Sequence, residues 1–148
     1  TAEAVIFGSG RPVVLLPERE PGYSLDQIAI GWDGSRAAAR GVADAGPLLR
    51  RASRISVITV LDEKPLKEKD AGEKLAKALR GHGHTAEVLA IRAEDGPIDI
   101  TLQRTAMDNG CGLLVMGGYG HSRMRDFVLG GATQGVLTDL RLPILLSH

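Results

Sequence analysis

Apolar residues along this chain follow two alternating periods. Short β-branched runs are separated by segments in which apolar residues recur every three or four positions, and this alternation predicts a parallel sheet covered by helices. We therefore expect an α/β fold with an open parallel five-stranded sheet and helices on both faces. The strand order is expected to be 3-2-1-4-5, which the periodicity does not itself determine. The predicted strands are Gln27–Gly31, Arg54–Val60, Thr85–Ile91, Gly112–Met116 and Ile144–Ser147, and the predicted helices follow Ser35 and span Asp70–Arg80, Ile98–Asn109 and Thr133–Leu140.

The helix after Ser35 has clear local signals. Serine is a favourable N-cap residue, and the apolar positions from 38 to 49 follow a 3.6-residue period. Pro47 lies inside this pattern and removes a backbone donor, so we expect it to kink the helix or break its hydrogen bonding.

Glycines concentrate between residues 117 and 131. The apolar run Leu113–Met116 leads into Gly117-Gly118-Tyr119-Gly120, and after nine further residues Gly130-Gly131 precede helix-forming sequence. Glycines let backbone N–H groups approach a ligand closely, and a helix start adds unpaired N–H groups. In the expected strand order these glycines lie opposite Asp33, at the switch point where parallel sheets bind ligands. The pattern predicts a phosphate-binding cradle, and tight turns without a ligand are the alternative.

Two common phosphate motifs are excluded. A Walker loop requires a lysine after its last glycine, whereas the last lysine in the chain is Lys77. A dinucleotide fingerprint requires G-x-G-x-x-G, but Arg123 stands at the third glycine position after Gly118 and Gly120, and Val13 stands there after Gly8 and Gly10.

The glycine spacing instead resembles the signature of the universal stress protein family. Gly117, two residues, Gly120, nine residues and Gly130 match its G-x-x-G, nine, G pattern. The resemblance extends over residues 27–148 and includes the sequence WDGS at 32–35, GP at 96–97 and LPILL at 142–146. It implies the adenine nucleotide alpha hydrolase-like fold of that family.

The resemblance also implies a nucleotide site. Transferred residue by residue, the family's contacts fall on Gly31, Trp32, Asp33, Val60, Met116, Gly117, Gly120, Gly130, Gly131, Ala132 and Thr133. The implied ligand is ATP or AMP, with Mg²⁺ only if ATP is bound. At Gly131, nucleotide-binding members carry Ser or Thr, so a backbone N–H remains there but a phosphate-binding hydroxyl is absent. We expect weak binding and a non-enzymatic role in stress adaptation.

Two other functional classes compete with this interpretation. The first is a nucleotide-free member of the family that acts as a dimerisation or scaffold module. Gly131 favours this class, whereas the intact glycine spacing favours nucleotide binding. The second is a receiver-type domain, which needs an acidic cluster at its first strand ends, where only Asp33 qualifies. Catalysis is not expected, because Ser122 lacks a nucleophile elbow and no carboxylate pair accompanies the glycines. Slow, incidental ATP hydrolysis is kept as an alternative to the absence of catalysis.

Several candidate residues have an ordinary structural alternative. Asp33 contacts the nucleotide or caps the following turn, and Trp32 lines an adenine pocket or covers the end of the sheet. Arg123 and Arg125 neutralise phosphate or are simply solvated, and His121 contacts phosphate or faces water.

The composition limits the kinds of partner that the protein is expected to bind. The 18 basic and 18 acidic residues balance, which argues against nucleic acid and anionic membranes as partners. The single cysteine, Cys111, cannot form an internal disulfide and is expected to be a buried small hydrophobe. His82 and His84 lack a third ligand, so no metal site is predicted. The apolar runs are too short to span a membrane, and we expect a cytoplasmic domain.

The N-terminal residues echo the C-terminal ones. Residues 4–16 resemble residues 135–146, and Pro12 and Pro143 lie 131 positions apart, about one module. We therefore predict that residues 1–17 are the tail of a preceding module, 18–26 a linker and 27–148 a universal stress protein domain; an unrelated N-terminal extension is the alternative. The predicted partner is a further copy, by self-association of the edge strand Ile144–Ser147 with Val13–Leu16, either within one chain or exchanged between two.

Overall fold

The computed structural model describes residues 5, 8–18, 22–61, 67–92, 98–117 and 139–147. All five predicted strands are present, and their ends differ from the predicted ones by at most one residue. The helix predicted for Thr133–Leu140 lies outside the described residues except for 139 and 140. The elements are β1 (Val13–Leu15), β2 (Gln27–Gly31), α2 (Arg36–Asp44), α3 (Gly46–Leu49), β3 (Arg54–Leu61), α4 (Lys67–Gly81), β4 (Ala86–Arg92), α5 (Ile98–Asp108), β5 (Leu113–Gly117) and β6 (Ile144–Ser147).

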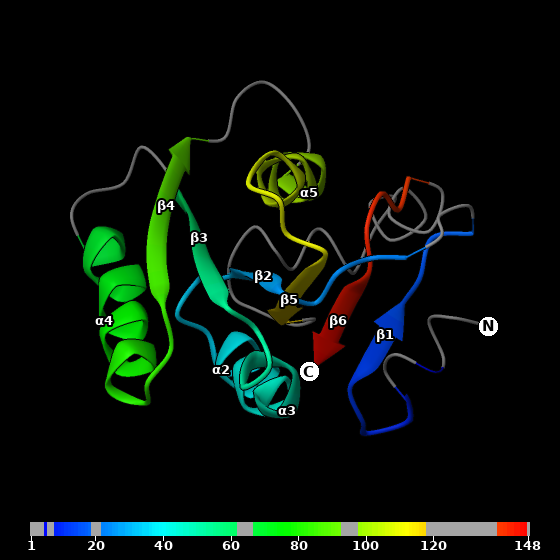
Figure 1. The fold of residues 1–148 in the computed structure, drawn as a ribbon, viewed down its shortest axis with the longest axis horizontal. Coiled ribbons are helices and arrows are strands. Elements are labelled where there is room, and N and C mark those ends of the chain that lie inside the picture. The colour runs from blue at the N-terminus through cyan, green and yellow to red at the C-terminus, as the bar shows by residue number, and fades with distance from the viewer. Residues whose placement is uncertain are drawn as a thin grey trace.

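The sheet has six strands in the order β1-β6-β5-β2-β3-β4 (Figure 1). From β4 to β6 the strands are parallel and have the predicted 3-2-1-4-5 order. The prediction of a wholly parallel five-stranded sheet is wrong, because β1 adds antiparallel to β6 and makes the sheet mixed. β1 supplies backbone partners to an apolar strand that would otherwise expose an unpaired edge. This pairing occurs within one chain, and self-association through the same edge stays a prediction.

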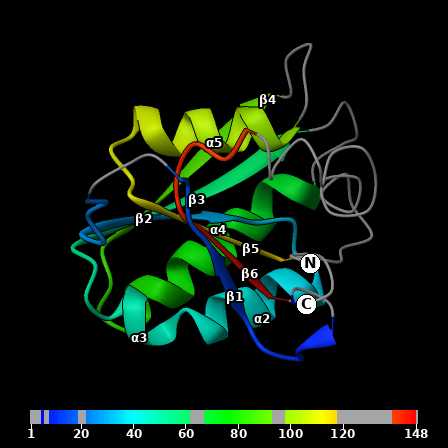
Figure 2. The same ribbon diagram turned by 90° about the vertical axis from the view of Figure 1, so that its right-hand side faces the viewer.

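Helices cover both faces of the sheet, as predicted. Figure 2 shows α5 on one side and α2 and α3 on the other. Alternate residues of the strands face the two layers: Ala29 and Ile58 pack with Leu102 of α5, whereas Ile28 and Val57 belong to a second cluster with residues of α3 and α4. None of the described helices is both long and apolar enough to cross a membrane.

The helix after β2 begins and breaks where the sequence predicted. The Ser35 hydroxyl caps α2 by accepting a hydrogen bond from the Ala38 N–H, 3.1 Å away. α2 ends at Asp44, and the chain starts again as α3, with Pro47 in its first turn. Proline is tolerated there because the first N–H groups of a helix have no intrahelical acceptor.

A buried amide holds the turn that leads into β6. The Gln103 side chain in α5 is fully buried. Its Nε2 donates to the Asp139 carbonyl at 3.3 Å, and its Oε1 accepts from the Arg141 N–H at 2.8 Å. The Tyr23 hydroxyl also donates to the Arg141 carbonyl, at 3.4 Å. α5 and the segment before β2 therefore fix where β6 starts.

Candidate functional site

The carboxyl ends of β2 and β5 form the switch point of the parallel sheet. These strands are paired, with Ile28 opposite Leu113 and Ile30 opposite Val115. The next strand along the chain lies on opposite sides of this pair: β3 beyond β2, and β6 beyond β5. Ligands of open α/β sheets bind where the strand order reverses in this way. We call residues 31–35, 60 and 116–117, at or beside these strand ends, the switch edge.

Trp32 directly follows β2, and its side chain is directed toward α4. Its N–H donates to the Ile58 carbonyl at 2.9 Å. Its indole Nε1 donates to the Ala71 carbonyl of α4 at 3.2 Å, and the half-buried ring packs on the cluster shared with α3 and α4. Trp32 therefore covers the end of the sheet on the α4 side, which is the structural alternative weighed for it. An adenine contact stays a prediction.

Asp33 organises the turn between β2 and α2. Its Oδ1 accepts a hydrogen bond from the Ser35 N–H at 2.9 Å, as in an Asx turn. Gly34, between them, has a φ of +75°, a conformation that side-chain-bearing residues rarely adopt. The turn sets up the Ser35 cap, so Asp33 has the capping role that is the alternative to nucleotide contact.

Met116 presents only its backbone to the switch edge, whereas the Val60 side chain is half-buried. The Met116 side chain is fully buried in the cluster that α5 covers, and the half-buried Val60 packs against the same cluster. Any ligand contact by Met116 in this arrangement therefore involves its peptide groups. Gly31, at the end of β2, is also buried.

Gly117 lies directly against the first turn of α2. A Cβ added to it would lie 2.4 Å from the Ala38 nitrogen and 2.5 Å from the Ala37 carbonyl carbon, closer than real Cβ atoms approach. Packing alone thus explains this glycine, a reason that the sequence interpretation missed. The run of three alanines at 37–39 was the available signal, since small residues on a helix allow close backbone approach.

The structure brings six of the eleven predicted contacts to or beside the switch edge. They are Gly31, Trp32, Asp33, Val60, Met116 and Gly117. The remaining predicted contacts, Gly120, Gly130, Gly131, Ala132 and Thr133, lie outside the described residues, as do His121, Arg123 and Arg125.

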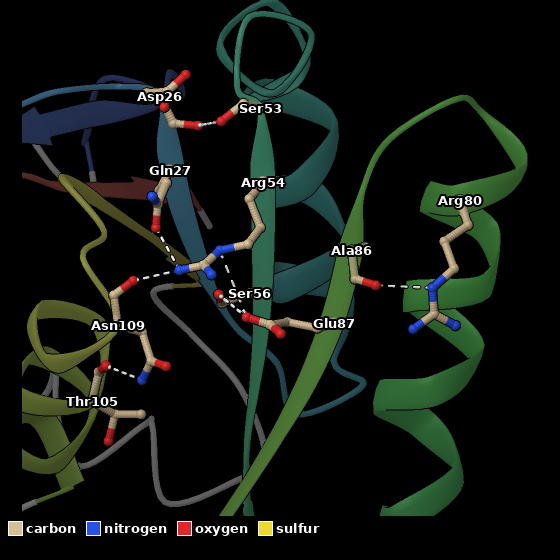
Figure 3. Close-up of polar contacts among 10 residues, drawn as sticks. All are labelled: Asp26, Gln27, Ser53, Arg54, Ser56, Arg80, Ala86, Glu87, Thr105 and Asn109. Atoms are coloured by element: carbon tan, nitrogen blue, oxygen red, sulfur yellow. Dashed lines mark hydrogen bonds and ion pairs between the residues drawn. The ribbon is translucent and has the colours of Figure 1, made fainter.

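At the opposite, amino edge of the sheet, Arg54 joins several elements (Figure 3). Its Nη2 donates to Gln27 Oε1 of β2 and, at 2.7 Å, to the Asn109 carbonyl after α5. Its Nε is buried without a hydrogen-bond partner and lies 3.7 Å from Glu87 Oε1, which also accepts from the Ser56 hydroxyl at 3.3 Å. Sequence reasoning missed this cluster, because a charged residue that opens a strand usually points to solvent.

Cys111 lies next to this amino-edge cluster. It is buried, with 6 % of its surface exposed, so the prediction of a buried small hydrophobe is confirmed. Burial raises the pKa of the Cys111 thiol, and a hydrogen bond with Ser56 opposes the rise only in part. The thiol is therefore protonated and unreactive at neutral pH. Within the described ranges, no three His, Cys, Asp or Glu residues gather closely enough to hold a metal ion.

Comparisons with known proteins agree on one family. A profile described as the universal stress protein family matches residues 24–148. The universal stress protein Slr1230 of Synechocystis is 26 % identical over 97 % of this chain, and the chain spans 49 % of that relative's length. The fold matches a universal stress protein from Archaeoglobus fulgidus with a TM-score of 0.75 at 17 % identity, covering 99 % of this chain and 52 % of the other. It also matches a universal stress protein solved in complex with cAMP, with a TM-score of 0.62 at 22 % identity, covering 83 % of this chain and 96 % of the other.

Proposed function

The chain belongs to the universal stress protein family, and we propose that it binds an adenine nucleotide weakly at the switch edge, without catalysis, in stress adaptation. The observation that carries this proposal is the pairing of β2 with β5 at the point where strand order reverses. That pairing puts the Gly31–Trp32–Asp33 turn beside the end of β5, from which the glycine-rich sequence continues. Backbone N–H groups from two loops can then converge on one anion.

The nature of the ligand is inferred from two sources. The six described contact positions are those at which the family's nucleotide contacts fall when transferred to this sequence. A protein of the same fold was solved in complex with cAMP, which supports an adenosine nucleotide for this chain. Because no lysine follows residue 77, charge compensation for phosphate is assigned to Arg123 and Arg125.

Weak binding follows from residue 131. Glycine there lacks the hydroxyl that would donate to a phosphate oxygen. A hydrogen bond to a charged group contributes roughly 1.5–3 kcal/mol, so the expected loss is about ten- to a hundredfold in affinity.

A non-enzymatic role is supported by the side chains at the switch edge. Within residues 31–35, 60 and 116–117, Asp33 is the one ionisable group. Phosphoryl transfer to water needs a group that positions the attacking water, and the described switch edge offers only Asp33 for this, whose Oδ1 already accepts a hydrogen bond from the Ser35 N–H. We expect phosphate release from ATP in the presence of the protein and Mg²⁺ to match the buffer control.

Titration calorimetry with ATP, AMP and cAMP tests the binding proposal. The parent should bind at least one of them weakly, and Gly131→Ser should bind it about ten- to a hundredfold more tightly. Gly81→Ser is the matched control, because Gly81 ends α4 and a Cβ added there meets no atom within 4 Å. Chromatography of the supernatant after denaturing the purified protein tests for nucleotide carried through purification. Absence of binding by both the parent and Gly131→Ser would contradict the proposal.

That negative result would favour a nucleotide-free scaffold or dimerisation module instead. Gly131 favours this second function in the sequence. In the structure, the bond of Trp32 to α4 and that of Asp33 within its own turn also favour it, because the indole N–H and one carboxylate oxygen already have hydrogen-bond partners within the chain.

A further inference from the structure

The only asparagine of the chain, Asn109, stands directly before Gly110 in the connection between α5 and β5. The side-chain amide of an asparagine in this position is open to attack by the next backbone nitrogen, because glycine has no side chain to hinder the approach. Asparagine is thermolabile, and proteins of hyperthermophiles contain less of it. The sequence therefore has a chemically labile pair at the end of α5.

Gly110 is required by the way in which α5 ends. The Gly110 N–H donates to the Met107 carbonyl at 3.0 Å and the Cys111 N–H donates to the Ala106 carbonyl at 2.9 Å, which are the two bonds of a Schellman motif. Gly110 has a φ of +76°, a conformation that residues with a side chain rarely adopt. The helix end that requires glycine after Asn109 is thus also the reason that Asn109 is labile.

Three hydrogen bonds hold the groups that would react. Asn109 Nδ2 donates to the Thr105 carbonyl at 2.8 Å, which keeps the side-chain amide against the preceding turn of α5 (Figure 3). The Gly110 N–H, whose proton must leave before its nitrogen can attack, is bound to the Met107 carbonyl. The Asn109 carbonyl accepts from Arg54 Nη2 at 2.7 Å, which fixes the peptide plane between Asn109 and Gly110. The native geometry therefore opposes the attack.

Arg54 ties this helix end to the sheet. It opens β3, and the same Nη2 also donates to Gln27 Oε1 of β2. Gln27 Oε1 lies 3.2 Å from the position that a Cβ of Gly110 would occupy, so β2 packs directly on the labile pair. As long as the end of α5 stays on β2 and β3, the peptide between Asn109 and Gly110 is held.

We propose that Asn109 is a deamidation site, protected while the amino-edge cluster is closed and modified when this cluster opens. In the reaction the Gly110 nitrogen attacks Asn109 Cγ, the new C–N bond closes a cyclic imide, and the Cγ–Nδ2 bond breaks. The proton of the Gly110 N–H leaves with the side-chain nitrogen as ammonia. Water then opens the imide at either carbonyl and gives aspartate or isoaspartate, so water is the only other reactant.

The products cannot rebuild the native contacts. Aspartate lacks the N–H groups that bond to the Thr105 carbonyl, and its carboxylate repels that oxygen. Isoaspartate lengthens the main chain by a methylene group, which changes the spacing of the Schellman motif. A transient local opening of the amino edge, which heat makes more frequent, is thereby converted into a lasting change where α5 meets β2 and β3.

Deamidation of the 148-residue chain, folded at neutral pH and unfolded in urea, tests this proposal. The tryptic peptide 105–123 contains Asn109 and no glutamine, so its mass gain reports this residue alone. Arg54→Ala is the test variant. Arg80→Ala is the matched control, because Arg80 Nε also donates to a backbone carbonyl, that of Ala86 at 2.8 Å, but between α4 and β4 (Figure 3). Gln27→Ala loosens the same contact and replaces Arg54→Ala if circular dichroism shows that this variant does not fold.

Asn109 should deamidate in urea, and at least about a hundredfold more slowly in the folded chain, because the reaction must wait for local opening. Arg54→Ala should raise the rate in the folded chain by about ten- to a hundredfold, the factor for loss of a hydrogen bond to a charged group, without changing the rate in urea. Arg80→Ala should keep the parental rate.

Stability of Asn109 in urea, or equal rates in the folded and unfolded chains, would overturn the proposal. So would a parental rate in the folded Arg54→Ala or Gln27→Ala variant, or an equal acceleration by Arg80→Ala.

Discussion

Replacing Gly117 by alanine distinguishes a packing glycine from a ligand-binding one. The added Cβ would lie 2.4 Å from the Ala38 nitrogen, 2.5 Å from the Ala37 carbonyl carbon and 2.9 Å from the Ala37 Cβ. Ordinary contacts of this kind begin near 3.4 Å, so the first turn of α2 must move away from β5 by about 1 Å, an overpacking of the core. That movement also disturbs the Ser35 cap, which bonds to the same Ala38 nitrogen.

Overpacking of a core typically costs about 1–3 kcal/mol of the free energy of unfolding. For a domain of this size the corresponding fall in Tm is roughly 3–10 °C. Urea and thermal unfolding followed by circular dichroism measure it. Gly81→Ala is the control, since its Cβ meets open space at the end of α4, and it should be neutral or slightly stabilising.

The two roles of Gly117 give opposite patterns. If Gly117 is needed for packing, Gly117→Ala has a lower Tm whether or not nucleotide is present. If Gly117 is needed only for ligand approach, Gly117→Ala keeps the parental Tm and binds nucleotide less tightly. Parental stability in Gly117→Ala would refute the packing account and return Gly117 to the ligand-contact set.

Substitutions at two residues and alkylation of a third test three separate features. Ser35→Ala should lower stability by about 0.5–2 kcal/mol through loss of the α2 cap, while Ser35→Asp should retain most of it in urea melts; equal stability of the two would argue against the cap. Burial raises the pKa of Asp99 in the folded protein above its ordinary value of 3.8. Between these two pKa values the unfolded chain releases a proton that the folded protein keeps, so the free energy of unfolding falls as the pH rises through this interval. Asp99→Asn should remove this loss, so its stability relative to the parent should be greater near about pH 7 than near about pH 3.5 in urea melts. Because burial also raises the pKa of Cys111, its alkylation should be slow in the native protein and fast in denaturant, and equal rates would contradict its burial.

Much of the fold follows from local sequence. Periodicity placed every strand of the parallel part of the sheet, Ser35 marked a helix start, and Pro47 marked a break, because each depends on residues close in the chain. The strand order agreed with a resemblance to a known family. Local sequence gives no signal for pairing between distant segments, so the predicted fold class left β1 out of the sheet. The pairing of β1 with β6 was predicted instead from the similarity between residues 4–16 and 135–146.

The candidate site was less predictable, for identifiable reasons. Glycine is selected both by ligand approach and by close packing, so Gly117 looked the same in either role until α2 was placed against it. The bond from Trp32 to Ala71 depends on where α4 lies, which no local pattern gives. No sequence signal marked Arg54, which only opens a predicted strand, yet it joins β2, β3 and the end of α5 because those elements converge at the amino edge.

The antiparallel ladder between β1 and β6 has a consequence for the order of folding. Its three residue pairs join positions 129 to 133 residues apart. β6 must already be seated beside β5, with its start held by Gln103, before β1 has a template. A small set of contacts between residues so far apart in the chain forms late, because the loop between them must close before their pairing contributes any stability. β1 is therefore the last strand to join the sheet, and it can leave by local opening while the parallel strands stay intact.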